Sequence, residues 1–343
     1  MTSTRNALFA GISVAALMFA SPAARGADLP TKAPIFAPRL AIQDRWVWWA
    51  EGGAIKAGDP AFGPFPFLTT PVGIQPGIGW EAAIGFDVVP ASFSPYHISG
   101  QFRYGEARRK NKSFPANVNI PSPPGFVFAT RTTSVFATGA GTADIKDKHW
   151  LVDFAVGREF QLGSGQVQAK VGVRIADIKV KITGSGTVSG TTSSGGFGSP
   201  VTGIFAFISR SRFLGVGPRI GVDGSVPLNG GWTFDYVGGV AVLFGERKLD
   251  STSTMTLVID PGTGSASAGT LNTAFSDSDF GAVFNLDAQA GFSYWFTKSF
   301  KMTASFRFDG YWNALRTVNS AGAIVNENRF YYGPMLRATW AFP

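Results

Sequence analysis

The sequence predicts an all-β fold, a transmembrane antiparallel up-and-down β-barrel of about ten strands, and three observations predict it. Apolar and polar residues alternate with a period of two over segments far longer than most soluble strands. Long and short connections alternate along the chain, as in barrels whose strands cross a bilayer back and forth. Charged residues make up only 15% of the 343 residues, against roughly 25% in soluble domains, while aromatic residues reach 14%.

The clearest element is a hairpin over residues 211–248. Leu214, Val216 and Ile220 alternate with glycine and polar residues on its first arm, and the alternation resumes after the turn at 229–231. A tilted membrane strand needs about nine to eleven residues to cross, which explains arms longer than the five or six residues of an average strand. The pattern predicts two neighbouring membrane strands.

The same alternation recurs along the rest of the chain. The predicted strands cover residues 44–55, 78–89, 97–107, 148–162 and 167–182, then about 204–226, 232–248 and 280–296, then a ninth strand from 300 and a tenth that ends at 342. A further pair drawn from parts of 126–137 or 253–259 would raise the count to twelve.

Long segments are predicted to be loops at one end of the barrel, with short turns at the other. The predicted loops cover residues 56–77, 108–145, 183–203, 249–279 and 314–327. Short periplasmic turns and long outer loops are the plan of bacterial outer-membrane barrels, so we expect both termini in the periplasm. The apolar residues of the fifth strand change parity near Ala176 and Asp177, which predicts a bulge there, and the prolines of Gly217-Pro218 and Gly333-Pro334 predict bulges or kinks.

The N-terminal segment has the composition of a signal peptide. A basic residue, Arg5, precedes an apolar run at 7–20, and small residues surround Arg25, so we expect residues 1–26 to be removed after export. A Pro-rich periplasmic lead-in at 27–43 then precedes a barrel domain at 44–343. Removing Arg5 and Arg25 leaves 28 basic against 22 acidic residues, a net charge of +6. Because the chain is exported and these residues are dispersed, we expect no nucleic-acid partner.

Aromatic side chains gather where the predicted strands leave the hydrocarbon. Those near the turn ends are Trp232, Phe234, Tyr294, Phe296, Trp340 and Phe342, and those near the loop ends are Tyr104, Trp150, Phe244, Phe284, Trp312 and Phe330. Two such girdles are typical of membrane barrels. The alternative, a secreted β-sandwich, would place these rings in a core between two sheets. It would also often carry disulfides, and the chain has no cysteine.

The parity of each strand predicts which charged side chains face inward. The predicted pore-lining residues are Glu81, Asp87, Arg103, Asp153, Lys170, Arg174, Arg219, Asp223, Asp235, Asp287, Arg307, Asp309 and Arg337. With Glu51, Glu159, Lys301 and Arg329 added, eight basic residues face nine acidic ones, which predicts no strong ion preference. The alternative is that these charges pair with one another and fill the interior, because ten strands leave a narrow lumen.

Motifs for other chemistry are weak. His149 is expected near the outer end of the fourth strand with Asp147 and Asp153 nearby, an arrangement that suits a rim-sited protease, but a lone rim histidine is more often solvated. His97 is expected at the periplasmic end of the third strand. The glycines at 215, 217 and 221 do not have dinucleotide-binding spacing, and no paired-histidine metal motif occurs. We predict no catalytic residue, no metal and no cofactor.

Several segments together resemble the Legionella-type major outer membrane protein family of pore-forming barrels. They are DRWVWWAEGG, WLVDFAVGREFQLG, VQAKVGVRIAD, RFLGVGPRIGVDGSVPLNGGW and the closing RFYYGPMLRATWAF, within residues 44–342. The resemblance implies a bacterial outer-membrane pore, not an enzyme, that lets small hydrophilic solutes or ions diffuse passively. The alternative is a closed structural or adhesive barrel that displays its outer loops. Expected partners are outer-membrane lipid and lipopolysaccharide, the outer-membrane assembly machinery and small solutes. The oligomeric state is not predicted.

Overall fold

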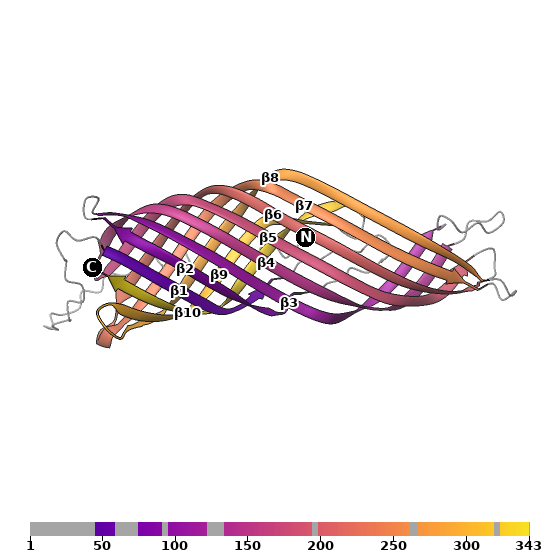
Figure 1. The fold of residues 1–343 in the computed structure, drawn as a ribbon, viewed down its shortest axis with the longest axis horizontal. Coiled ribbons are helices and arrows are strands. Elements are labelled where there is room, and N and C mark those ends of the chain that lie inside the picture. Colours follow the sequence, from indigo (N-terminus) through magenta and orange to yellow (C-terminus); the bar gives the residue numbers. More distant parts are fainter. Residues whose placement is uncertain are drawn as a thin grey trace. The chain divides into compact units, whose positions relative to one another are not determined.

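The structure is a computed structural model that describes residues 45–58, 75–90, 95–121, 134–193, 198–260, 266–318 and 323–342. Its strands form one closed antiparallel barrel, in which each strand pairs with its neighbours in sequence and β1 pairs with β10 (Figure 1). The predicted signal peptide at 1–26 and lead-in at 27–43 lie outside the described residues.

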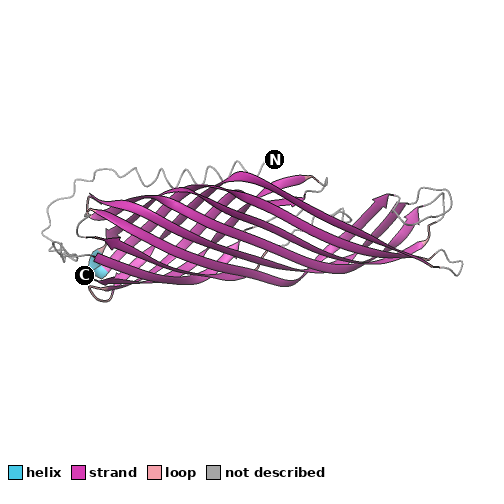
Figure 2. Ribbon diagram, turned by 45° about the horizontal axis from the view of Figure 1, so that its top comes forward, coloured by secondary structure: helices cyan, strands magenta, loops and turns pink. Residues whose placement is uncertain are grey.

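The strands are β1 (Arg45–Ala57), β2 (Ile78–Val89), β3 (Tyr96–Pro121), β4 (Ser134–Leu162), β5 (Gly165–Ser193), β6 (Pro200–Pro227), β7 (Trp232–Ile259), β8 (Ser267–Trp295), β9 (Phe300–Val318) and β10 (Ile324–Phe342). A short helical turn, η2 (Asn229–Gly231), joins β6 to β7 and is drawn in cyan in Figure 2. Among the described residues, no helix is long and apolar enough to cross a membrane.

The prediction of a ten-stranded barrel is confirmed, but β3, β4, β5, β7 and β8 are much longer than predicted, and β6 exceeds the predicted 204–226 by five residues. The bounds of β2 agree with the prediction, whereas β3 to β8 contain 26 to 29 residues each. The segments predicted as loops at 108–145, 183–203 and 249–279 are largely continuations of these strands. Residues 134–137 belong to β4 and 253–259 to β7, so they add no further pair within the described chain. Figure 1 shows β3–β8 running on past the ends of the other strands.

In β5, the polarity of each face changes along the strand, while the same alternate side chains continue to point inward. Near the turn its even-numbered side chains, such as Lys170 and Arg174, point into the barrel, while Val171 and Val173 are 62% and 48% exposed on the outside. Farther along, Ile178 and Val180 point inward and are buried, while Lys179 points outward. The predicted bulge at 176–177 is wrong, because β5 pairs with β4 and β6 in unbroken register through these positions. The chemistry of the two faces is exchanged, and the backbone is regular.

The outer parts of β3–β8 therefore form an inverted structure, which we call the extension. It comprises residues 108–121, 134–147, 178–193, 200–211, 248–259 and 267–279. Its interior is mostly apolar and includes the ring cluster of Phe114, Phe205 and Phe207, with centroids 6.0–6.5 Å apart. Its outside carries mainly threonine, serine and basic side chains. Apolar inside and polar outside is the arrangement of a domain in water, so the extension stands outside the hydrocarbon.

A β-bulge in β3 fits the extension to the barrel. The register with β4 shifts between Arg109 and Lys112, and Asn111 adopts a positive φ of 52°. The side chain of Asp144 accepts a hydrogen bond of 2.7 Å from the backbone N–H of Asn111. Below the bulge odd-numbered residues of β3 face inward, and above it Phe114 and Ala116 do so. The extra residue places the apolar side chains of β3 in the interior of the extension.

The two Gly-Pro pairs interrupt the ladders without shifting them, so the predicted bulges are wrong. Pairing of β6 with β7 stops after Val216–Phe244 and resumes at Arg219–Ala241 in the same register. A Cβ at Gly217 would lie 1.8 Å from the carbonyl oxygen of Val242. Proline cannot donate to the ladder, and only glycine lets the neighbouring strand approach this closely.

The aromatic side chains form rows at both ends of the apolar band. At the turn end, the ring centroid of Tyr294 lies 5.1 Å from that of Trp232 and 5.0 Å from that of Phe296, and Phe300 contacts Trp340 at 5.6 Å. At the other end, Trp312 lies 5.4 Å from Phe284 and 5.6 Å from Phe330. These rings mark the two interfaces of the membrane band.

One prediction tests the exchange of faces on β7. Val240 faces outward within the apolar band, and Thr254 faces outward on the extension. Val240→Lys should lower the free energy of unfolding by about 2–4 kcal/mol, since it places a charge in hydrocarbon. Thr254→Lys on the same face should change it by less than about 0.5 kcal/mol. Urea unfolding in lipid vesicles measures both, and equal effects would contradict the assignment.

Candidate functional site

All thirteen side chains predicted to line a lumen point into the barrel. Their parity follows from the ladders of the barrel, each of which keeps one register through the apolar band and holds every second side chain on the inner face. Eight of them are at most 6% exposed, namely Glu81, Arg103, Asp153, Arg174, Arg219, Asp287, Arg307 and Asp309. The structure brings the set together in several groups of ion pairs along the barrel interior.

The central cluster is organised by Arg174. Its Nε and Nη2 donate to the two carboxylate oxygens of Asp153 at 2.7 and 2.6 Å, a bidentate pair between directly opposed residues of β4 and β5. Its Nη1 donates to Asp287 of β8 at 2.6 Å, and the other oxygen of Asp287 accepts from Arg219 at 2.9 Å. The side chain of Arg174 is completely buried. Four charged groups from four strands thus fill the middle of the lumen.

A second cluster centres on Glu51 and Arg307. Arg307 donates to Glu51, to Glu81 and, at 2.8 Å, to the side-chain oxygen of Gln289. Arg337 donates to Glu51 at 2.8 Å, and its guanidinium lies 4.2 Å from the ring centroid of Trp49. The buried carboxylates of Glu51 and Glu81 are thereby compensated by arginine, as buried charges require.

Arg103 links Glu81 of the second cluster to Asp309 on another wall of the lumen. It reaches from β3 to Asp309 of β9 at 2.5 Å and to Glu81 at 3.9 Å. Strands β3 and β9 are separated by three strands around the barrel, so this ion pair spans the interior and does not follow the wall. Charged side chains from separate walls are therefore in contact across the lumen at this level.

A third group of charges lies at the turn end. Lys170 pairs with Asp223 and, at 3.2 Å, with Asp87, whose carboxylate also contacts His97 Nδ1 at 2.9 Å. Lys301 donates to Asp235 at 2.5 Å. His97 lies at this end of β3 as predicted, and its ring is fully buried. These side chains continue the charged column to the turns.

His149 does not lie where the sequence placed it. Because β4 begins at Ser134, His149 is near the middle of the strand and not near its outer end. It is 4% exposed, its Nε2 lies 2.8 Å from Glu81, and its ring packs on Tyr331 at 4.0 Å between centroids. A peptide at the outer rim would not reach this ring, so the structure does not support the arrangement that favoured a protease.

Sequence reasoning missed several inner polar groups. Asp147 accepts hydrogen bonds from Arg329 and, at 3.0 Å, from Tyr331. Asn285 accepts from Arg174, and Gln289 binds both Glu51 and Arg307. Asp147 shares the parity of Asp153, which was the available signal, but it precedes the strand predicted at 148–162 and so was not among the predicted inner residues. For the uncharged amides of Asn285 and Gln289, the sequence offered no sign of an inner role beyond the parity of their strand.

The described residues of the β9–β10 hairpin beyond Trp312, which are 313–318 and 323–328, contact inward-facing side chains of β6 and β8, and we call them the arm. Pairing of β9 with β8 ends at Trp312, and the next residue, Asn313, adopts a positive φ of 60°. Beyond it, Arg316 pairs with Asp277 and Asp279 of β8, and its backbone N–H donates to Ser211 Oγ of β6 at 3.1 Å. Ala314 and Leu315 are buried. The arm lies at the outer end of the charged lumen.

The arm carries one half-buried carboxyl group. Glu327 is half-buried, its Oε2 has no hydrogen-bond partner among the described residues, and it lies beyond the aromatic row at Phe330. Burial raises the pKa of Glu327 to about 8, because the charged form loses its hydration there. Glu327 is therefore largely protonated at neutral pH.

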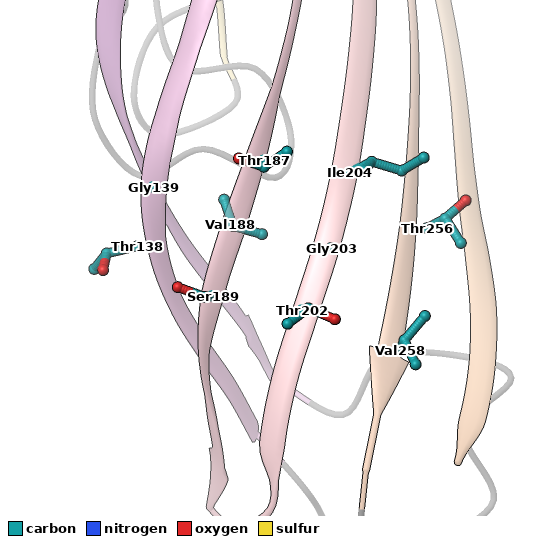
Figure 3. A pocket seen from close by; sticks show the side chains of 10 residues that line it. All are labelled: Thr138, Gly139, Thr187, Val188, Ser189, Thr202, Gly203, Ile204, Thr256 and Val258. Carbon is teal, nitrogen blue, oxygen red and sulfur yellow. The ribbon is translucent and has the colours of Figure 1, made fainter.

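A separate hollow lies on the outside of the extension. Its volume is about 470 Å³, and it is lined by Thr138, Gly139, Thr187, Val188, Ser189, Thr202, Gly203, Ile204, Thr256 and Val258 (Figure 3). The lining has hydroxyl and methyl groups but no charged side chain. Among the described residues, no group of three or more histidine or acidic side chains could hold a metal ion. The ionisable chemistry of the described chain is concentrated in the lumen.

The sequence matches the family described as Legionella pneumophila major outer membrane protein precursor over residues 100–342. The chain belongs to this family. As a member of it, the protein is an outer-membrane barrel and is located in the bacterial outer membrane. No curated protein matches the sequence.

Solved barrels are similar to this family member at low identity. The outer membrane protease OmpT from Escherichia coli is 10% identical, with a TM-score of 0.40, over 88% of this chain and 97% of that one. A major outer membrane protein from Thermus thermophilus is 13% identical, with a TM-score of 0.24, over 88% and 100%. The COG4313 outer membrane channel from Pseudomonas putida F1 is 9% identical, with a TM-score of 0.26, over 92% and 100%. These values are too low to carry a function to this chain.

The central cluster generates a stability prediction. Arg174→Met leaves Asp153 and Asp287 buried with only part of their compensation and should destabilise the barrel by about 3–5 kcal/mol. Lys298→Met removes an exposed cation at a turn and should cost less than about 0.5 kcal/mol. Urea unfolding in vesicles compares the two, and a small loss for Arg174→Met would show that water reaches these carboxylates.

Proposed function

We propose that this protein is a narrow, gated pore that lets small hydrophilic solutes or ions diffuse across the outer membrane. In this proposal both chain termini lie on the periplasmic side and the extension projects outward. The thirteen inner side chains named above line the path, with six basic residues against seven acidic ones. This near balance predicts weak selectivity between anions and cations.

One observation carries the proposal: the chain fills its two interiors with opposite chemistry. The extension is filled with apolar side chains such as Phe205, Phe207 and Leu257. Within the membrane band the interior instead contains arginines and carboxylates, which are costly to desolvate and which apolar residues of similar volume often replace without loss of stability. Since this sequence can build an apolar filling, filling space does not account for the charges. A polar path that takes up water when it opens accounts for these charges.

The arm supplies the means of opening. It rests against β6 and β8 through Ser211, Asp277 and Asp279, and Asn313 is a point at which it departs from the barrel wall. Movement of the arm would expose the outer end of the column at Asp147 and Arg329. The ion pairs beneath could then exchange partners with water and with permeating ions.

A specific observation favours a second candidate, a closed barrel whose role is to display its outer part. Arg174, Arg329 and Asp147 are completely buried, which supports a lumen that its own side chains fill. A barrel that stays sealed would serve as a structural or adhesive element. We propose no enzymatic role, because the imidazole of His149 is engaged inside the lumen by Glu81 and Tyr331.

Locking the arm separates the two candidates. The chain has no cysteine, so Ser211→Cys combined with Arg316→Cys introduces one pair, at a place where Arg316 N lies 3.1 Å from the Ser211 side chain. In planar bilayers the reduced variant should conduct, and oxidation should lower conductance more than about tenfold, since the cross-link removes the open state. Reductant should restore conductance.

The single-cysteine variants, which form no intramolecular bond, are the matched controls and should not respond to the oxidant. Equal conductance before and after oxidation would exclude the arm as the gate. No conductance above the lipid background for wild type and reduced variant alike would exclude the pore and leave the closed barrel.

Glu327 predicts the pH dependence of opening. Its pKa is about 8 in the closed arm, above the ordinary value of 4.5, so the closed arm binds the proton more tightly than a hydrated Glu327 does. The stability of the closed arm should therefore be greatest at low pH and fall as pH rises from about 4.5 to about 8.

Conductance of the wild type should rise over that window, and Glu327→Gln should remove the rise by keeping the side chain neutral. Glu246→Gln, on the outer face of β7, is the matched control and should retain it. An unchanged profile for Glu327→Gln would show that this carboxyl does not control the arm.

A further inference from the structure

Two rows of basic side chains cross the outside of the barrel where the apolar band meets the extension. Three successive strands carry a basic residue, one inward residue and a second basic residue: Lys146 and Lys148 on β4, Lys179 and Lys181 on β5, Arg210 and Arg212 on β6. Arg108 on β3 and Lys248 on β7 extend the pattern. We call these eight residues the basic rows.

The registers of β3 to β7 align them side by side. In the row nearer the band, Lys148 is directly opposite Lys179, Lys179 opposite Arg212, and Arg212 opposite Lys248. In the row above it, Arg108 is opposite Lys146, Lys146 opposite Lys181, and Lys181 opposite Arg210. All eight side chains point outward, and the six in ion pairs are 35–51% exposed. The rows are therefore open to the surroundings of the barrel.

The rows lie immediately beyond the aromatic side chains of the band. On β4, Lys148 follows Trp150 on the same face, and on β7, Lys248 lies four residues beyond Phe244 on that face. Two residues of a strand span about 7 Å. This is the level at which the headgroups of lipids surround a barrel whose apolar band ends at those rings.

Electrostatics makes the rows unfavourable without an anion. Like charges directly opposite each other in a sheet repel, and the nearer row places four cations in succession. Asp177 compensates Lys179 and Arg212, and Glu106 compensates Arg108, Lys146 and Lys148. Lys181 and Arg210 form no ion pair within the described chain. With Glu106, Asp177, Glu246 and Asp250 counted, four positive charges remain in excess.

We propose that the basic rows bind the phosphate groups of a phosphorylated lipid of the outer leaflet, whose acyl chains lie against the apolar band below. The charge complementarity and the continuity with that band identify a lipid, since a soluble anion would have no use for the adjacent apolar surface. The proposal rests on the expected orientation, with the extension outside, and does not depend on whether the lumen conducts.

The test uses the full-length barrel in dodecyl maltoside micelles, titrated with diphosphoryl lipid A and with its monophosphoryl form. Lys181→Gln combined with Arg210→Gln removes the two unpaired cations, and Arg158→Gln combined with Lys298→Gln removes two exposed cations at the turn end as a matched control. A basic residue near a lipid surface contributes about a fivefold factor in affinity, so the first variant should raise the Kd for diphosphoryl lipid A about 25-fold. The control should change it less than about twofold.

The lipid phosphate should account for the difference in affinity between the wild type and Lys181→Gln/Arg210→Gln. Loss of one phosphate should weaken binding to the wild type strongly and to Lys181→Gln/Arg210→Gln only slightly. Melting of that variant without lipid should occur at the wild-type temperature or above it, because repulsion has been removed, which separates binding from folding. Equal affinity of the wild type for both lipids, an equal loss in the control variant, or displacement of the lipid by inorganic phosphate at the same concentration would each overturn the proposal.

Discussion

A strand in a bilayer must satisfy its backbone hydrogen bonds with other strands, because the hydrocarbon supplies no water. This constraint closes ten strands into a barrel and fixes which side chains face lipid. It also explains why the register is so regular, since a slip by one residue would turn every apolar side chain of a strand inward. The two Gly-Pro interruptions keep that register, and Gly217 shows how closely the strands approach where proline cannot donate.

The constraint ends at the basic rows, and the composition of both faces changes there. Below them the outside is apolar and the inside is a column of ion pairs around Arg174, Arg307 and Arg103. Above them the inside packs Phe114 against Phe205 and Phe207, and the outside is polar. The same strands thus cross the hydrocarbon and then continue into water. The arm lies where the charged interior of the membrane band meets the apolar interior of the extension. The outer boundary of the apolar band therefore determines three positions: the end of the charged column, the place of the arm and the place of the basic rows.

The period-two pattern was sufficient to predict the barrel, the strand count and the inward position of all thirteen lumen charges. It was not sufficient for strand length, because the apolar residues move to the other face beyond Ala176, and the end of the membrane pattern predicts a loop or a bulge there. The repeated basic-x-basic segments at 146–148, 179–181 and 210–212 were the signal of a continuing strand. The partners of each lumen charge depend on contacts across the barrel, such as Arg103 with Asp309, which spacing along one strand does not encode.

The most direct measurement is the depth profile of outward positions along β7. Since the chain contains no cysteine, spin labels can be attached one at a time at Val240, Val242, Phe244, Lys248, Thr252 and Thr254 in lipid vesicles. Collisions with oxygen, which dissolves in lipid, should dominate up to Phe244, and collisions with a water-soluble nickel complex should dominate from Lys248 onward. A lipid signal that continues to Thr254, or its absence at Val240, would contradict a membrane band that ends at the basic rows.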